Sequence, residues 1–173
     1  RWDADIAALA LATLDLTDLG DNTTEEAALA LCERAAKYHT AAVCVWPRFV
    51  SACAKALAGT GVGVATVVNF PSGDEGIESV AQMTRLAVAD GADEIDVVLP
   101  YRAFLAGDTA RPAALLDAVR EAAGDKAVKV IIESGELVDP EIIKAAASLA
   151  VERGAQFVKT STGKSPVSAT PEA

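Results

Sequence analysis

The sequence predicts a single-domain α/β protein in which helices cover a parallel sheet. Short runs rich in Val, Ile and Ala alternate with amphipathic segments, which gives a repeating strand–helix order. Each run is apolar on both faces, as a parallel sheet covered by helices requires. The clearest runs begin at residues 41, 63, 94, 127 and 156, so they recur every 22 to 33 residues, the spacing of strand–helix units.

The elements are expected in the following order. We predict strands at residues 41–46, 63–70, 94–99, 127–133 and 156–160, with a weaker strand at 11–16 whose Ala and Leu content also suits a helix. We predict helices at residues 24–38, 48–58, 75–90, 112–123 and 140–153. Thr23 or Thr24 can cap the first helix, and Asp139 followed by Pro140 is a strong start for the last.

Composition excludes several classes of function. The formal net charge of −10 argues against a general nucleic-acid-binding protein, which would normally present a basic face. No apolar run approaches the roughly 20 residues of a membrane span, and the first residues do not resemble a signal peptide. Cys32, Cys44 and Cys53 have no metal-type spacing and predict a reduced, cytoplasmic protein. His39 is the only histidine, so we expect no metal site and a helix-terminal role for this residue.

Charged residues within the apolar strands help to choose between two architectures, an open doubly wound sheet and a (β/α)8 barrel. Asp15, Asp96, Lys129 and Lys159 each interrupt a predicted strand, and an open sheet has little room for four such charges. A barrel gathers inward-pointing side chains around one axis, with the active site at the carboxyl ends of its strands. We therefore predict the (β/α)8 TIM-barrel class, with about six strand–helix units. The alternative for these charges is a buried ion pair without chemistry.

Lys159 is the candidate nucleophile. It closes an apolar strand and precedes a small polar loop that contains Gly163 and a second lysine, Lys164. A lysine in an apolar setting loses its proton more easily, and the neutral amine can attack a carbonyl to form a Schiff base. The competing interpretation is a lysine whose ammonium extends from the strand end into water.

Six segments together resemble the deoxyribose-phosphate aldolase family. They are LDLT (14–17), AVCVWPRF (42–49), ATVVNFP (65–71), GADEIDVV (91–98), VKVIIESGEL (128–137) and FVKTSTGK (157–164). The resemblance runs nearly from end to end. It implies a (β/α)8 fold and a class I aldolase that reversibly cleaves 2-deoxy-D-ribose 5-phosphate to D-glyceraldehyde 3-phosphate and acetaldehyde, with no metal or organic cofactor.

The same resemblance implies roles for individual residues. Lys159 matches the Schiff-base lysine, Asp96 the aspartate that works with water in proton transfer, and Lys129 a lysine beside the reaction centre. A neighbouring cation such as Lys129 would lower the pKa of Lys159 by like-charge repulsion. The residues matched to substrate binding are Asp15, Thr17 and Cys44, which line the pocket, and Thr162, Gly163 and Lys164 in the phosphate loop.

The sequence departs from the family pattern at its end. We count six strands instead of eight, and a barrel typically takes about 250 residues. The segment of GFKPAGG type in the seventh strand and the GASS-type loop of the eighth are missing. We expect a retained part of a longer chain; the alternatives are a barrel completed by a partner chain or homo-oligomer, and a short form without activity. The first and sixth strands should then be sheet edges, and the isolated chain should turn over weakly or not at all.

Three functions remain open from the sequence. The first is the Schiff-base aldolase acting on a small phosphorylated sugar. The second is a non-catalytic phosphate-binding or assembly subunit on the same fold. The third is another barrel lyase that shares the lysine chemistry.

Overall fold

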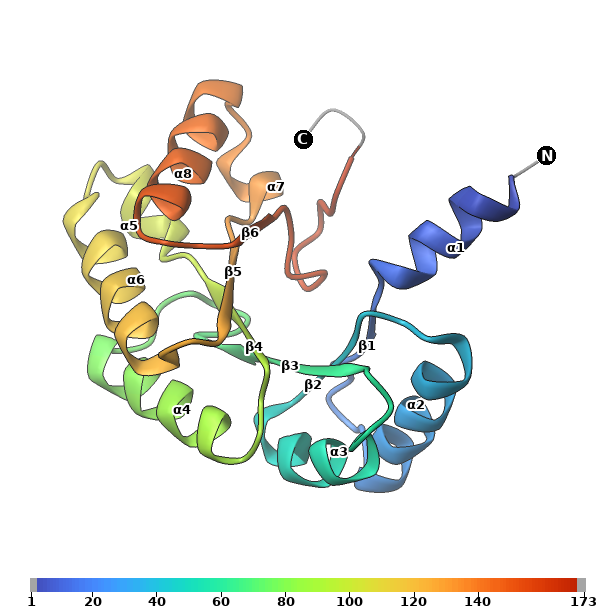
Figure 1. The fold of residues 1–173 in the computed structure, drawn as a ribbon. Coiled ribbons are helices and arrows are strands. Elements are labelled where there is room, and N and C mark those ends of the chain that lie inside the picture. The colour runs from blue at the N-terminus through green and yellow to red at the C-terminus, as the bar shows by residue number, and fades with distance from the viewer. Residues whose placement is uncertain (1–2, 171–173) are drawn as a thin grey trace. The chain divides into compact units, whose positions relative to one another are not determined.

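The computed structural model describes residues 3–170, and its strands form one sheet in sequence order (Figure 1). The strands are β1 (Asp15–Asp18), β2 (Ala42–Val45), β3 (Gly63–Val68), β4 (Glu94–Val98), β5 (Ala127–Ile131) and β6 (Phe157–Lys159). The pairs β1–β2, β2–β3 and β5–β6 are parallel. The predicted parallel α/β fold is confirmed, and the five clearest strands lie where the apolar runs predicted them.

The chain separates into two compact units, so the prediction of a single domain stays a prediction. The first unit comprises residues up to 66 together with 87–94, and the second comprises 67–86 together with the residues from 95 onward. Strands β3 and β4 are each divided between the two units.

In the first unit, α2 (Glu25–Tyr38) packs on β1 and β2. Thr24 caps the helix, because its hydroxyl accepts a hydrogen bond from the Ala27 N–H at 3.2 Å. His39 ends it in the left-handed conformation at φ 54°, which confirms the helix-terminal role expected from the sequence. The buried stripe of α2 is Ala28, Leu31, Cys32 and Ala35. These residues recur at helical spacing and bury one face of α2.

A short 3-10 helix, η1 (Pro47–Phe49), leads into α3 (Val50–Ala56), which contacts α2. All three cysteines are buried, and none of them forms a disulfide. Cys32 of α2 and Cys53 of α3 are hydrogen-bonded to each other, and this contact together with burial raises the pKa of the Cys53 thiol well above its usual range. Cys53 therefore stays protonated at neutral pH and packs as a small apolar side chain.

The first helix was not predicted, and the weaker strand expected at residues 11–16 is shifted. Residues 11–16 were expected to form a weak strand, but α1 (Ala4–Ala12) includes Leu11 and the strand begins only at Asp15. Asp3 caps this helix by accepting a hydrogen bond from the Asp5 N–H at 3.2 Å. None of the α1 residues is buried, and Ile6 and Leu9 are 52% and 65% exposed. The helix thus forms through local propensity and capping, without a buried face.

The second unit contains the helices α5 (Tyr101–Leu105), α6 (Ala110–Ala123), α7 (Ser134–Leu137) and α8 (Pro140–Glu152). It also contains most of α4 (Ile77–Ala89), whose last three residues belong to the first unit. Helix α6 contacts β5, and α8 contacts both α7 and β6 (Figure 1). Asp139 caps α8 by accepting from the Glu141 N–H at 2.8 Å, with Pro140 in the first turn, as predicted. The short helices α5 and α7 were not predicted.

Asn69 stabilises the turn that follows β3. It is fully buried in the left-handed conformation at φ 56°; its amide donates to the Val98 carbonyl at 2.8 Å and its Oδ1 accepts from the Glu75 N–H at 2.9 Å. We expect Asn69→Ala to lower the free energy of unfolding by about 3 kcal/mol, because buried backbone groups lose their partners and alanine disfavours this conformation. Urea denaturation checks this, with the exposed Asn22→Ala as control. A loss below about 1 kcal/mol, the net value of one ordinary hydrogen bond, would contradict it.

The last strand lies at one edge of the sheet, and β1 lies at the other, as predicted. Phe157 and Val158 of β6 are 56% and 37% exposed. An edge strand with apolar side chains can pair with another strand. Among the helices of residues 3–170, none is long and apolar enough to cross a bilayer.

Candidate active site

The second unit brings three of the predicted site residues together. Lys159 of β6 donates a hydrogen bond from its Nζ to Oδ2 of Asp96 on β4. Lys129, on the intervening strand β5, places its Nζ 4.0 Å from Oδ1 of the same carboxylate. One carboxylate on β4 therefore contacts two ammonium groups, one from β5 and one from β6.

Strand register explains why these side chains meet. Lys129 is aligned with Phe157 and Ile131 with Lys159, and side chains two residues apart on a strand share a face. Lys129 and Lys159 therefore project from the same face of the sheet at successive levels. The Lys129 ammonium also lies 5.7 Å from the centre of the Phe157 ring, a cation–π contact.

Burial differs sharply across the three residues. The Asp96 side chain is fully buried and that of Lys129 is 6% exposed, whereas that of Lys159 is 32% exposed. A buried carboxylate is tolerated because it is paired with cations, and removing a partner from such a cluster is costly. Lys159 is the member of the cluster that a small molecule can reach.

The loop after β6 carries the other predicted residues of this unit. Gly163 has φ +75° and Lys164 is exposed. The Lys164 N–H donates to Oγ1 of Thr162 at 3.0 Å, which closes a tight turn. The structure thus places Thr162, Gly163 and Lys164 in one turn that begins three residues after Lys159.

Glu133 is a site residue that sequence reasoning did not identify. It follows β5 in the left-handed conformation at φ 55° and is 1% exposed. Its carboxylate contacts Thr162 and Ser165 in the loop after β6. The signal in the sequence was a carboxylate at the end of the predicted strand 127–133, on the face that it shares with Lys129 and Ile131.

Tyr101, at the start of α5, is 4% exposed. Burial raises the pKa of its phenol, the Arg102 guanidinium lowers it, and the Glu136 and Glu133 carboxylates raise it. The phenol is therefore neutral at pH 7.

The first unit brings together the remaining predicted residues. Thr17 on β1 is aligned with Cys44 on β2, and Asp15 lies two residues before Thr17, so all three share one face of this part of the sheet. The Thr17 hydroxyl donates to the Asp15 carbonyl at 2.9 Å. Cys44 is 1% exposed, which fits a core thiol, while Asp15 is half-buried.

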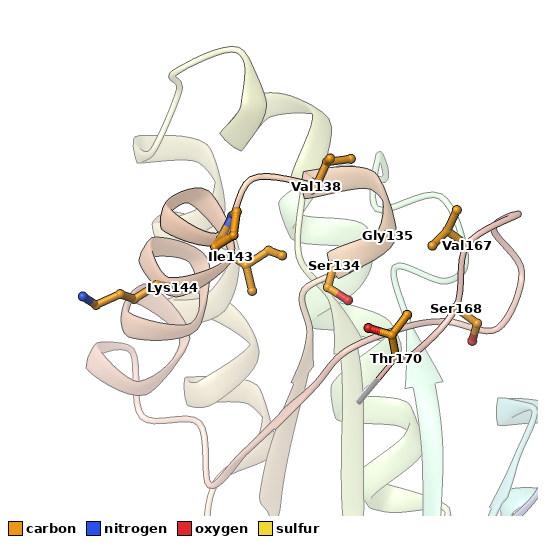
Figure 2. Close-up of a pocket in the computed structure, with 9 residues that line it drawn as sticks. Ser134, Gly135, Val138, Ile143, Lys144, Val167, Ser168 and Thr170 are labelled. Atoms are coloured by element: carbon orange, nitrogen blue, oxygen red, sulfur yellow. The ribbon is translucent and has the colours of Figure 1, made fainter. Parts of the chain in front are cut away.

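A hollow of about 480 Å³ lies beside α7 and α8 (Figure 2). Its lining comprises Ser134, Gly135, Val138, Pro140, Ile143, Lys144, Val167, Ser168 and Thr170. The main chain of residue 167 approaches α7 so closely that a Cβ on Gly135 would lie 2.3 Å from the Val167 carbonyl oxygen. None of the three clustered charges lines this hollow, so we assign it no part in the chemistry.

Within residues 3–170, no group of three His, Cys, Asp or Glu side chains could hold a metal ion. A family model described as DeoC/LacD family aldolase matches residues 9–173. The chain belongs to the DeoC/LacD aldolase family. This membership confirms the resemblance deduced from the six sequence segments.

Proteins assigned as deoxyribose-phosphate aldolases are similar to most of this chain. A deoxyribose-phosphate aldolase from Agrobacterium fabrum is 50% identical over 172 residues, covering 96% of this chain and 66% of the relative. A solved structure assigned as a deoxyribose-phosphate aldolase from Coccidioides immitis has a TM-score of 0.89 and 34% identity, covering 94% of this chain and 64% of that one.

A second solved structure, from Toxoplasma gondii and assigned to the same activity, has a TM-score of 0.85 and 33% identity, covering 94% of this chain and 63% of that one. The chain therefore spans just under two thirds of the length of these relatives. The likeness confirms the predicted TIM-barrel-type fold, here represented by six strands.

Proposed function

We propose that the Lys159 centre performs class I aldolase chemistry, reversibly cleaving 2-deoxy-D-ribose 5-phosphate to D-glyceraldehyde 3-phosphate and acetaldehyde. The observation that carries this proposal is the contact between the partly exposed Lys159 amine and the fully buried Asp96 carboxylate. Membership of the DeoC/LacD aldolase family and the name of the Agrobacterium fabrum relative support the reaction class and the substrate.

The first step makes a Schiff base. Lys159 passes a proton to Asp96, and the neutral amine attacks the aldehyde carbon of the open-chain sugar. Loss of water from the resulting carbinolamine leaves an iminium ion. Asp96 is placed to return a proton to the departing hydroxyl because it contacts the Lys159 amine directly.

The second step breaks the bond between C2 and C3. The C3 hydroxyl loses its proton, the C3 oxygen becomes a carbonyl, and the bonding electrons move to the iminium nitrogen to give an enamine. Protonation at C2 and hydrolysis of the imine then release acetaldehyde and regenerate Lys159. Lys129 supplies a positive charge beside the Asp96 carboxylate, which transfers these protons. The lysine itself provides the electron sink, so the reaction needs no metal or organic cofactor.

The turn at residues 162–164 is proposed to bind the phosphate. Lys164 offers an exposed cation and the turn offers main-chain N–H groups, which together form the kind of site that binds an anion. Such a local site is needed because the whole chain carries a formal charge of −10, which repels a phosphorylated sugar at long range.

Asp15, Thr17 and Cys44, which lie in the first unit, are proposed as substrate-binding residues. They share one face of β1 and β2, and Asp15 and Thr17 supply polar groups for the sugar hydroxyls. We further propose that the protein works in the cytoplasm and that a partner chain or homo-oligomer contributes to the complete assembly. The exposed apolar side chains of Phe157 and Val158 on β6 support this last point.

Borohydride reduction in the presence of acetaldehyde tests the proposed chemistry. Reduction of the imine should attach an ethyl group irreversibly to one lysine, and peptide mass mapping should locate it at Lys159. Incubation with borohydride but without aldehyde is the control. A folded chain that gains no ethyl group would favour the non-catalytic phosphate-binding or assembly subunit.

A further inference from the structure

Glu133 is a buried acid that the aldolase mechanism does not use. Its side chain is 1% exposed and its backbone adopts the left-handed conformation, which is uncommon for a residue other than glycine. A buried carboxylate is expensive unless it is hydrogen-bonded, and a residue held in this conformation needs support from its surroundings.

Both oxygens of Glu133 accept hydrogen bonds from the loop after β6. Oε1 accepts from the Thr162 N–H at 3.1 Å, and Oε2 accepts from the Thr162 hydroxyl at 2.6 Å. Oε1 also lies 3.2 Å from the Ser165 hydroxyl, which shares its single proton between this oxygen and the Val167 carbonyl at 2.9 Å. The adjacent main chain adds a fourth contact, because the Ser134 N–H donates to the Thr160 carbonyl at 2.7 Å. Glu133 and Ser134, which follow β5, thus hold the loop at Thr160, Thr162 and Ser165.

The contact with Thr162 also orders the next residues. Because the Thr162 hydroxyl donates its only proton to Glu133, its oxygen is left as an acceptor, and the Lys164 N–H donates to it at 3.0 Å. The position of the Lys164 main chain therefore depends on Glu133 through a single hydroxyl. Only a carboxylate accepts at both oxygens; a glutamine would present an N–H group to one of these donors.

We infer that Glu133 is a positioning residue for phosphate recognition, because it fixes the turn formed by Thr162, Gly163 and Lys164. This inference rests on the proposed function for its ligand, the phosphate of the sugar substrate. Glu133 touches neither the phosphate nor the reacting carbon. Its negative charge is compatible with an anion site because its oxygens face the three donors of the loop.

Amide hydrogen exchange of the 173-residue chain tests the anchoring without reference to catalysis. In Glu133→Gln we expect exchange at the Thr162 and Lys164 amides to accelerate by at least tenfold, while amides of β4 and β5 keep their rates. Glu136→Gln is the matched control, because it makes the same chemical change at an exposed position three residues later, in the short helix α7. Unchanged exchange at Thr162 and Lys164 in Glu133→Gln would overturn the inference.

Saturation of borohydride trapping tests the link to phosphate. Glu133→Gln should raise the half-saturating concentration of 2-deoxyribose 5-phosphate roughly tenfold, which corresponds to about 1.4 kcal/mol, and leave that of acetaldehyde unchanged. Thr162→Val should also raise the half-saturating concentration of 2-deoxyribose 5-phosphate. A general loss of structure would raise the half-saturating concentrations of both aldehydes by the same factor. That result would overturn the inference.

The two experiments also separate this inference from the proposed function. A wild-type chain that forms no adduct with either aldehyde would refute the aldolase proposal. The exchange measurement would still decide whether Glu133 holds the turn.

Discussion

Lys159→Leu is expected to abolish the borohydride-dependent ethylation by acetaldehyde while the chain stays folded. Leucine has no amine, so no imine can form and there is nothing for borohydride to reduce. The substitution leaves the backbone pairing of β6 with β5 intact, and the side chain it replaces is one-third exposed. Intact-mass analysis after reduction measures the loss, and far-UV circular dichroism establishes that the sheet persists.

A second lysine variant supplies the comparison. Lys55→Leu removes an exposed lysine of α3 and should leave ethylation at the wild-type level. Persistent ethylation in Lys159→Leu at an unchanged rate would show that another lysine is the nucleophile. Lys129 would then be the first residue to examine, because it contacts the same carboxylate.

Asp96→Asn is expected to lower the free energy of unfolding by about 3 kcal/mol and to suppress trapping at Lys159 strongly. The carboxylate is fully buried between two ammonium groups, and its removal leaves Lys129, which is almost as deeply buried, without its counter-charge. Asparagine also cannot take up the proton that Lys159 must release. Urea denaturation measures the first effect and the initial rate of ethylation the second.

A double variant distinguishes loss of charge balance from loss of packing. Adding Lys129→Met to Asp96→Asn should restore at least 1 kcal/mol of the lost stability, because the uncompensated ammonium is removed while the volume is nearly kept. The exposed Asp125→Asn makes the same chemical change and should alter the free energy of unfolding by less than about 0.5 kcal/mol. If the double variant is less stable than Asp96→Asn alone, charge imbalance does not explain the loss.

The strands were predictable because burial on both faces leaves a clear mark in the sequence. Residues of β2 and β4 are almost all buried, and their Val- and Ile-rich runs have no helical periodicity. The helix α1 was misread because its Ala- and Leu-rich sequence has neither a polar face nor a buried one. Helix α7 was missed because four residues after a strand carry no periodic pattern.

The charged cluster was partly predictable and the loop anchor was not. Alternation along the strands placed Lys129 and Asp96 on faces where they could meet Lys159, and the structure brings all three together. The partners of Glu133 lie about thirty residues away, in a loop whose path is set by tertiary contacts. Its left-handed backbone is likewise invisible in the sequence, since glutamate is not a residue that favours this conformation.

The apolar side chains that α1 and β6 leave in contact with water also govern how separate molecules behave toward one another. At pH 7 every molecule carries the same formal charge of −10, and the resulting electrostatic repulsion between molecules keeps these exposed apolar surfaces from associating. That repulsion disappears near the sequence isoelectric point of about 4.5, and at 0.15 M ionic strength it reaches only about 8 Å. The protein should therefore stay in solution longest in dilute buffer at neutral pH. On mild acidification, it should precipitate at a higher pH than the pH at which it unfolds.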